Sequence, residues 1–355
     1  MEYPPVSVVM PVRNEERHLA EAVRHVLGQD YPGEFELVLA VGPSGDQTEQ
    51  IARDLAAAQP RLTVVPNPTG KIPAALNAAI GAARHAVIAR MDGHALMPPG
   101  YLAAAVAALT ETGAADVGGV MAAVGVTTFQ QAVAWAMTSK AGVGSAAFHT
   151  GGGAGPVDSV YLGIYHREAI ERAGGWDEGM LRAEDWDLNY RIRAGGGRIW
   201  FTPDLRVTYR PRASVLTLAA QYFHYGRWRR VIVREHPETA SFRYLAPPAA
   251  AALVTVGLLV GPAGLVADAP AAAQWLTVGL AIPVVYLAGV TAVGAALSRG
   301  LQATVRLRIP LVLAVMHMAW GAGFLTSPRG LHRKSDTRVG QPDAATESPA
   351  AAGAE

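Results

Sequence analysis

The chain of 355 residues contains no cysteine, which excludes disulfide bonds, thiolate metal sites and cysteine nucleophiles. Charged residues are scarce, at 17% of the chain with a formal net charge of +1, so no bulk attraction to nucleic acid is expected. The N-terminus, M-E-Y-P-P-V-S, has no basic start and no long apolar stretch, so we expect no signal peptide. No G-x-G-x-x-G motif follows the first predicted strand, which argues against a nucleotide-dependent oxidoreductase.

Short apolar runs alternate with helix-spaced segments in the N-terminal part of the chain. The pattern predicts strands at 6–12, 35–41, 62–65 and 86–91, and helices at 15–27, 48–58 and 74–83. Such alternation is typical of right-handed β-α-β units, and it predicts an α/β fold with a mostly parallel sheet. Ligands bind beyond the carboxyl ends of strands in these sheets. The polar residues at those predicted ends are Asn14, Glu15, Ser44, Asp46, Asp92 and His94.

The composition changes along the chain and indicates four regions. Residues 1–213 carry the strand and helix pattern, and residues 214–245 interleave aromatic side chains with arginines. Residues 246–327 are almost uncharged and hold apolar segments at 246–267, 275–297 and 309–326. The first two reach the roughly 20 residues that a membrane-spanning helix needs, and the third is marginal. The alternative is a set of buried helices in a soluble domain. Residues 328–355 are basic, then rich in Pro, Ala, Gly and Ser, and we expect them to be disordered.

The segment R-M-D-G-H-A at 90–95 ends an apolar strand on polar side chains. Asp92 and His94 lie two residues apart, which places them on the same side of an extended chain. Gly93 between them lets the backbone approach a ligand. A carboxylate suits Mg²⁺ or Mn²⁺, and an imidazole favours Mn²⁺. An ordinary Asp-Gly turn after a strand fits the same residues.

An acidic pair, Glu184 and Asp185, precedes the helix-spaced segment W-D-L-N-Y-R-I-R. The pair therefore lies at a predicted helix N-terminus. A carboxylate there can act as a general base, or it can simply cap the helix and complement its dipole.

Three further segments carry polar groups near the predicted site. H-T-G-G-G-A-G-P-V-D at 149–158 is expected to be a mobile loop over the site, and Lys71 either approaches phosphates or is solvated. Q-Y-F-H-Y-G-R-W-R-R at 221–230 is expected to form a helix in the bilayer interface, because apolar segments follow it. Single-stranded nucleic acid would use similar residues.

In their order and spacing, these motifs resemble those of family 2 glycosyltransferases, and in particular the succinoglycan-biosynthesis glucosyltransferase subgroup. The resemblance spans residues 5–235 and rests on V-S-V-V-M-P-V-R-N-E-E, S-G-D-Q-T, T-G-K-I-P-A-A-L-N-A-A-I, R-M-D-G-H-A, A-G-G-W-D-E, R-A-E-D-W-D-L-N-Y-R and Q-Y-F-H-Y-G-R-W. It implies the type A glycosyltransferase fold, a Rossmann-like, mostly parallel sheet that binds a nucleotide-sugar. It also implies inverting, single-displacement transfer from a nucleotide-diphosphate sugar, with a UDP-sugar as the expected donor, in cell-surface polysaccharide or glycolipid synthesis.

The resemblance assigns roles to individual residues. Asp92 and His94 match the family's D-x-D and would hold Mg²⁺ or Mn²⁺ on the donor diphosphate, although His94 departs from the usual aspartate. Asp185 matches the catalytic base, and Glu184 its neighbour. The donor-binding set is Pro11, Asn14, Glu15, Ser44, Asp46, Lys71, Asn77, Arg90 and Asp92. The acceptor or interface set is Trp186, Gln221, Arg227 and Trp228.

Two departures from the family pattern bear on specificity. Processive members carry Q-x-x-R-W, whereas five residues separate Gln221 from Arg227 here, which argues against processive synthesis. V-G-P-S at 41–44 stands where the family has D-D-G-S or D-G-G-S, so the aspartate that contacts the base is missing. The choice of UDP over another nucleotide therefore stays open.

The apolar segments and the basic residues around them predict a topology. We expect a protein of the cell (plasma) membrane with a cytoplasmic catalytic domain, because Arg243, Arg299, Arg306 and Arg308 would then lie inside. Three full crossings would put the basic residues after 328 outside, so 309–326 is either a re-entrant or interfacial helix or an exception to the rule. An inner-leaflet site favours a lipid-linked, polyprenyl acceptor. The rival readings are a membrane-anchored protein that binds nucleotide-sugars or glycans without catalysis, and a transport or scaffold component.

Overall fold

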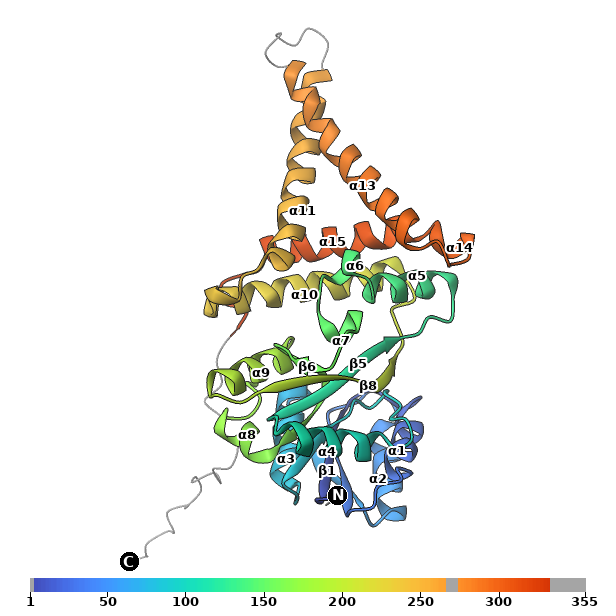
Figure 1. Ribbon diagram of the computed structural model, residues 1–355, viewed down its shortest axis with the longest axis vertical. Helices are drawn as coiled ribbons and strands as arrows, with labels where there is room; N and C mark the ends of the chain where they lie inside the picture. The colour runs from blue at the N-terminus through green and yellow to red at the C-terminus, as the bar shows by residue number, and fades with distance from the viewer. Residues whose placement is uncertain (1–2, 266–273, 333–355) are drawn as a thin grey trace, which may run out of the picture.

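An eight-stranded sheet forms the centre of the N-terminal part of the molecule (Figure 1). The computed structural model describes residues 3–265 and 274–332. In spatial order the strands are β3 (Leu62–Pro66), β2 (Phe35–Val41), β1 (Val6–Val12), β4 (Val87–Arg90), β7 (Tyr161–His166), β5 (Asp116–Ala123), β8 (Ile199–Tyr209) and β6 (Gly155–Pro156). The pairings among β1 to β4 and between β5 and β8 are parallel, and β7 and β6 pair antiparallel to their neighbours. The expected α/β fold with a mostly parallel sheet is confirmed.

Helices cover both faces of this sheet, which explains why its strands are apolar on both sides. Along β1, Val8 and Met10 belong to one buried cluster and Val9 belongs to the other. The first cluster includes residues of α1 (Leu19–Leu27), α2 (Thr48–Ala58) and α4 (Tyr101–Thr112). The second includes residues of α3 (Ile72–Ala82), α8 (Arg167–Arg172) and α9 (Glu184–Ala194). The carboxyl ends of β1, β2 and β4 are thereby held at one edge of a packed core.

Two helix starts differ from the sequence prediction for local reasons. The helix expected from residue 15 begins at Leu19, because Asn14 has a φ of 55° and the backbone N–H of Glu15 donates to Thr48. The helix expected from residue 74 begins at Ile72, with Pro73 in its first turn, where proline needs no hydrogen-bond donor.

The C-terminal helices lie beyond the sheet and fall into two groups. The helix α11 (Phe242–Val260), extended by η2 (Gly261–Leu265), and α13 (Ala281–Leu297), preceded by η3 (Trp275–Leu280), rise away from the sheet as a pair (Figure 1). By contrast, α15 (Ile309–Leu325) runs beside α10 (Val215–Glu235), across the base of that pair. Short helices α5 (Thr128–Met137), α6 (Lys140–Val143), α7 (Ala147–Thr150), α14 (Ala303–Arg306) and η1 (Pro237–Thr239) complete the described chain. Phe242–Leu265, Trp275–Leu297 and Ala303–Leu325 are long and apolar enough to cross a bilayer.

Glycines allow α10 and α15 to pack backbone against backbone. A Cβ added at Gly226 of α10 would lie 1.9 Å from the carbonyl oxygen of Trp320, and one at Gly323 of α15 would lie 2.0 Å from that of Phe223. Within the described residues, 39% of the most apolar window of 303–325 is buried against protein, compared with 6% for 275–297. The third apolar segment is therefore the one most covered by the rest of the chain.

The sequence predicts a disordered tail from residue 328, but the folded structure continues to residue 332. Arg234 of α10 donates to the carbonyl oxygens of Ser327 and Pro328, at 2.7 and 2.9 Å. The imidazole of His332 lies between Glu235 at 2.5 Å and Asp177 at 3.0 Å. These contacts order 328–332; the rest of the expected disordered tail, 333–355, lies outside the described residues.

Candidate functional site

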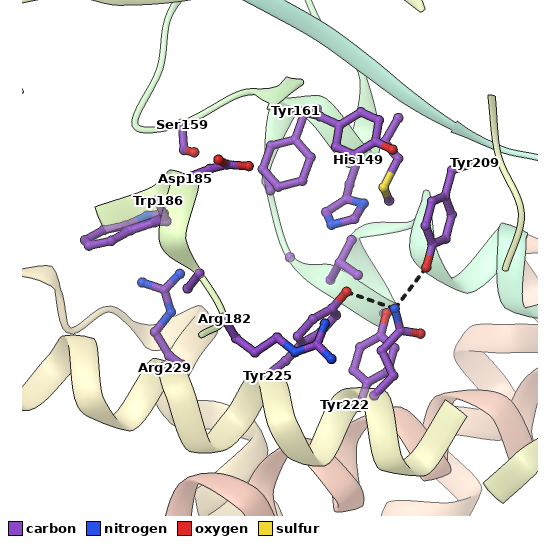
Figure 2. A pocket seen from close by; sticks show the side chains of 18 of the residues that line it. His149, Ser159, Tyr161, Arg182, Asp185, Trp186, Tyr209, Tyr222, Tyr225 and Arg229 are labelled. Carbon is purple, nitrogen blue, oxygen red and sulfur yellow. Dashed lines mark hydrogen bonds between the residues drawn. The ribbon is translucent and has the colours of Figure 1, made fainter. Parts of the chain in front are cut away.

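A cavity of about 1490 Å³ separates the carboxyl edge of the sheet from the C-terminal helices. Its lining comes from β4 and the residues after it, from the start of α9, and from α10, α11 and α15. Figure 2 shows side chains from α7, β7, β8, α9 and α10 turned toward the same space. The predicted residues that line it are Glu15, Arg90, Asp92, His94, Glu184, Asp185, Trp186, Gln221 and Trp228.

At one end of the cavity lie Asp92 and His94, the residues expected to hold a metal ion. Their side chains are 21% and 50% exposed. His94 Nδ1 lies 2.8 Å from Glu15 Oε1, and this hydrogen bond raises the pKa of His94. A carboxylate that engages one ring nitrogen is the usual way of orienting a histidine ligand, and it leaves Nε2 for the metal. The sequence prediction placed Glu15 at the donor; the structure places it behind His94.

These two ligands fit a divalent ion that is completed by substrate. Within 3–265 and 274–332, no cluster of three or more His, Cys, Asp or Glu side chains could enclose a metal. Mg²⁺ and Mn²⁺ at diphosphates usually take one or two protein ligands, with phosphate oxygens and waters supplying the rest. Asp92 and His94 are therefore enough protein ligands for such a metal site.

The loops after β1 and β2 are joined by hydrogen bonds among predicted donor-site residues. The backbone N–H of Asn14 donates to Ser44 Oγ at 3.1 Å, and Asn14 Oδ1 accepts from the N–H of Gly45 at 2.8 Å. Asp46 Oδ2 accepts from the N–H of Glu16 at 3.2 Å. The structure thus brings Asn14, Ser44 and Asp46 together beside the cavity rather than in its wall.

Three other predicted donor residues lie away from the cavity lining. Pro11 is part of β1, and Lys71 is exposed at the start of α3. The side-chain amide of Asn77 is taken up by the backbone of Trp176, donating to its carbonyl oxygen at 2.8 Å and accepting from its N–H at 2.9 Å. Asn77 therefore positions Trp176, and the structure gives it no free group to offer a donor.

Arg90 joins the metal end of the cavity to the acidic pair. Its Nη1 donates to Asp185 Oδ1, and its Nη2 lies 3.3 Å from both Asp92 Oδ1 and Glu184 Oε1. The side chain is only 5% exposed. Burial by itself would lower the pKa of Arg90, but the three carboxylates raise it well above its ordinary value. The sequence prediction grouped Arg90 with the donor; the structure uses it to gather carboxylates from two distant segments.

Asp185 is held by one oxygen and free at the other. Besides Arg90, the indole N–H of Trp176 donates to Asp185 Oδ1 at 3.0 Å. Hydrogen bonds to Oδ2 are absent among the described residues, and the side chain, 23% exposed, faces the cavity (Figure 2). A carboxylate fixed in this way presents a single lone-pair-bearing oxygen to a ligand.

Glu184 differs from its neighbour because it is buried. Its side chain is 12% exposed, and burial, followed by repulsion from Asp185, raises the pKa of Glu184 to about 7. The preceding residue, Ala183, has a φ of 61°, a left-handed conformation that alanine adopts at a cost of roughly 1 kcal/mol. This backbone turn directly precedes the two acids, which open α9 and both reach Arg90.

The cavity wall that α10 forms together with Tyr209 is aromatic, as the aromatic residues at 221–230 led us to expect. Gln221 Nε2 donates to the hydroxyls of Tyr209 and Tyr225, at 2.9 and 2.8 Å (Figure 2). Trp228 lines the cavity and packs with Met180. Arg227 does not line it; its guanidinium lies 5.7 Å from the ring of Phe223.

Sequence reasoning missed several residues of this wall. They come from β7, the loop before α9, β8, α10 and α11: Tyr161, Arg182, Tyr209, Tyr222 and Arg243. The segment 149–158, expected to be a mobile loop, continues from α7 into β6 and contributes His149 and Asp158 to the cavity. Burial, together with the charge of Arg243, lowers the pKa of His149 to about 4, so its imidazole is neutral at pH 7.

Comparison with known proteins adds sequence and structural relatives. The pattern described as "Glycosyl transferase family 2" matches residues 7–174. The chain is 33% identical over 321 residues to succinoglycan biosynthesis protein ExoA of Rhizobium meliloti (strain 1021), covering 89% of this chain and 93% of that protein. A stretch of 108 residues is 40% identical to the putative glycosyltransferase EpsE of Bacillus subtilis (strain 168), covering 30% of this chain and 38% of that protein.

Among solved structures, the mannosyltransferase PcManGT from Pyrobaculum calidifontis, in complex with GDP-Man and Mn²⁺, has a similar fold. The TM-score is 0.58 at 22% sequence identity, and the alignment covers 92% of this chain and 88% of that one. The type A fold expected from the sequence is thereby confirmed. Asp92 and His94 follow β4 at the carboxyl edge of the sheet, the edge at which open α/β sheets in general bind ligands.

Proposed function

We propose a membrane-bound, inverting transfer for this chain, which belongs to glycosyltransferase family 2. A sugar passes from a nucleoside-diphosphate donor to a lipid-linked, polyprenyl-type acceptor during synthesis of a cell-surface polysaccharide or glycolipid. One observation carries the proposal: a single cavity contains the Asp92–His94 pair, the free oxygen of Asp185 and a wall made by the apolar C-terminal helices.

The chemistry requires a base, because an acceptor hydroxyl is a poor nucleophile. Asp185 Oδ2 takes the hydroxyl proton while the hydroxyl oxygen bonds to the anomeric carbon of the donor. The bond from that carbon to the diphosphate oxygen breaks on the opposite face, its electron pair leaves with the nucleoside diphosphate, and the configuration inverts. Arg90 and Trp176 fix Oδ1, so that Oδ2 keeps its direction toward the acceptor.

Asp92 and His94 would hold the metal ion, Mg²⁺ or Mn²⁺, with Glu15 orienting the imidazole. When bound, the metal neutralises the charge that develops on the departing diphosphate. The loops that carry Asn14, Ser44 and Asp46 border this end of the cavity, and we assign them to the nucleotide. A UDP-sugar is the first donor to test, with GDP-sugars second, because 41–44 lacks the aspartate expected to read the base.

The site belongs, in this proposal, on the cytoplasmic face of the plasma membrane. The helices α11 and α13 would cross the bilayer, while α10 and α15 would lie at the inner leaflet. Support comes from the packing of α15 along α10 and from the arginines that flank the apolar segments. Such a placement opens the cavity toward lipid and favours a lipid-linked acceptor.

The direct test incubates membranes containing the protein with a panel of radiolabelled nucleotide-sugars and identifies the labelled product. We expect label in an organic-extractable lipid, dependent on added Mg²⁺ or Mn²⁺. The rival function is a non-catalytic protein of the same fold that binds nucleotide-sugars or glycans. Donor binding without transfer to any lipid or glycan, in membranes that support transfer by an active relative, would favour that rival.

Single cysteines test the topology, because the parent chain has none. Variants with a single cysteine in place of Ala272, Gly300 or Gly330 would be treated, on intact cells, with a membrane-impermeant thiol reagent. Labelling at 272 alone supports two crossings with an interfacial α15, and labelling at 272 and 330 supports three. Labelling at 300 without 272 contradicts the cytoplasmic placement.

A further inference from the structure

Arg229 is a cation in the cavity wall that pairs with no carboxylate among the described residues. The residue projects from α10, and its guanidinium lies 4.6 Å from the ring centre of Trp186 (Figure 2). It also lies 4.0 Å from the ring centre of Tyr244. Its Nη1 is buried and has no hydrogen-bond partner among the described residues. Burial lowers the pKa of Arg229 from its ordinary value, which marks the cost of holding this charge without a counter-ion.

A second unpaired donor lies beside it. The indole Nε1 of Trp186 is also buried and finds no hydrogen-bond acceptor in 3–265 or 274–332. Both groups can only donate, and an unsatisfied buried donor costs roughly 1–3 kcal/mol. Two such donors at one place in an open cavity indicate a missing acceptor, which would be supplied by a ligand.

The charges around Arg229 favour an anion as that ligand. Arg243 also lines the cavity; it contacts the same ring, at 4.4 Å from the centre of Tyr244, and adds a second positive charge. Asp158, an acid whose charge raises the pKa of Arg229, is already paired with Arg193 at 3.4 Å. Arginine's planar fork of N–H groups matches the oxygens of a phosphate, and its stacking on aromatic rings preserves that fork.

The position of this pair relates it to the reaction. Asp185 and Trp186 both lie at the start of α9 and line the same cavity (Figure 2), so a ligand held by Trp186 and Arg229 shares that wall with the proposed base. Arg229 itself comes from α10, and Tyr244 from the start of the apolar helix α11. A group bound here therefore lies between the base and the helices proposed to meet the membrane.

We infer that Arg229 and Trp186, assisted by Arg243, form a subsite for the phosphate or diphosphate of the acceptor. The inference rests on the proposed function, in that it takes the acceptor to be a sugar attached through phosphate to an isoprenoid lipid. The subsite holds the phosphate at the membrane side of the cavity, so that the attached sugar extends toward Asp185. It is separate from the donor diphosphate, which belongs at Asp92 and His94.

The test measures binding to the full-length protein in detergent, by calorimetry, with EDTA present so that no metal assists at Asp92. The probes are farnesyl diphosphate, farnesol and inorganic pyrophosphate. We expect farnesyl diphosphate to bind at least tenfold more tightly than farnesol, and Arg229→Gln to remove that difference. Arg230→Gln is the matched control, because Arg230 is the next residue of α10 but lies 4.9 Å from the ring centre of Phe324, which is outside the cavity lining.

Each outcome decides the question. Equal binding of farnesyl diphosphate and farnesol, or no effect of Arg229→Gln, overturns the subsite. Pyrophosphate that binds as tightly as farnesyl diphosphate, and depends on Arg229, supports an anion subsite but assigns it to free phosphate groups and overturns the lipid assignment. If Arg229→Gln does not fold, Arg229→Lys keeps the charge without the planar fork and should still weaken the diphosphate probe severalfold. Metal-dependent hydrolysis of donor sugar, measured separately, reports on the proposed function, so its failure is not confused with failure of the subsite.

Discussion

Replacing Arg90 by glutamine should destabilise the protein in a pH-dependent way. Arg90 is 5% exposed and contacts the carboxylates of Asp92, Glu184 and Asp185, which are 12–23% exposed. Removing one partner of a buried ion pair costs about 3–5 kcal/mol, because the remaining charge is left without compensation. Here three carboxylates would repel one another, so we expect a loss of at least ~3 kcal/mol at pH 8.

The pH dependence follows from the direction of the pKa shifts. Burial, followed by repulsion from Asp185, already raises the pKa of Glu184 to about 7, and removing Arg90, whose charge lowers it, would raise that pKa further above its unfolded value. The folded variant would then bind more protons than the unfolded chain, so its stability is retained at low pH and lost as the pH rises through the folded-state pKa of Glu184. At pH 5 part of the repulsion is relieved by protonation, and we expect the loss to fall to ~1 kcal/mol.

The assay is thermal unfolding of the full-length protein in detergent, followed by tryptophan fluorescence at pH 5 and pH 8. A loss of 3 kcal/mol corresponds to a decrease in Tm of roughly 6–12 °C for a domain of this size. Arg172→Gln is the control, because Arg172 pairs with Glu168 at the surface, where the side chains are 67% and 73% exposed, and such pairs contribute about 0–1 kcal/mol. A decrease in Tm for Arg90→Gln that equals the control, or that is the same at both pH values, would refute this account of the cluster.

Four more predictions concern the base, its neighbour, the metal and the helix packing. Asp185→Asn should leave donor binding intact and slow transfer by roughly 10²–10⁴-fold; a rate near that of the parent would remove Asp185 from the role of base. Glu184→Gln should slow transfer less. Because the pKa of Glu184 is raised to about 7, the parent should lose stability on the order of 2 kcal/mol between about pH 4.5 and pH 7, and the variant should not show this decline in Tm. A Tm–pH profile that the substitution leaves unchanged speaks against the raised pKa. EDTA should abolish transfer in the parent, whereas His94→Asp should remain active with an altered preference between Mg²⁺ and Mn²⁺; full activity in EDTA would exclude the metal. Gly226→Leu should lower the Tm and the yield of folded protein, because its side chain would collide with the backbone of α15, whereas Gly289→Leu, with nothing within 4 Å of its Cβ, should be tolerated; equal behaviour of the two variants would contradict the packing of α10 on α15.

The elements and candidate residues that the sequence predicts share one property: their signal is local. The strands of the sheet were predictable because buried parallel strands are short, continuous apolar runs. Asp92 and His94 stand out because they directly follow such a run, and Glu184 and Asp185 because they begin a helix-spaced segment. The apolar segments after residue 246 were evident for the same reason, since length and composition alone define them.

Pairings between distant segments were not predictable, because a contact across the fold leaves no spacing to read in a single sequence. Arg90 contacts Asp185 across 95 positions, and Asn77 contacts Trp176 across 99. The contacts by which Arg90 and Asn77 help to hold Asp185 therefore appeared only once α3, β4 and the segment leading into α9 were packed together. Composition could propose α15 as a membrane span, but it took the glycines that face each other across α10 and α15 to place it along another helix. The sequence by itself determined the α/β fold, the family and the candidate metal and base residues. Only the tertiary structure decided which oxygen of Asp185 is free and that Arg229 lies against Trp186 with no carboxylate partner among the described residues, because burial and the absence of a partner depend on every segment that surrounds a side chain.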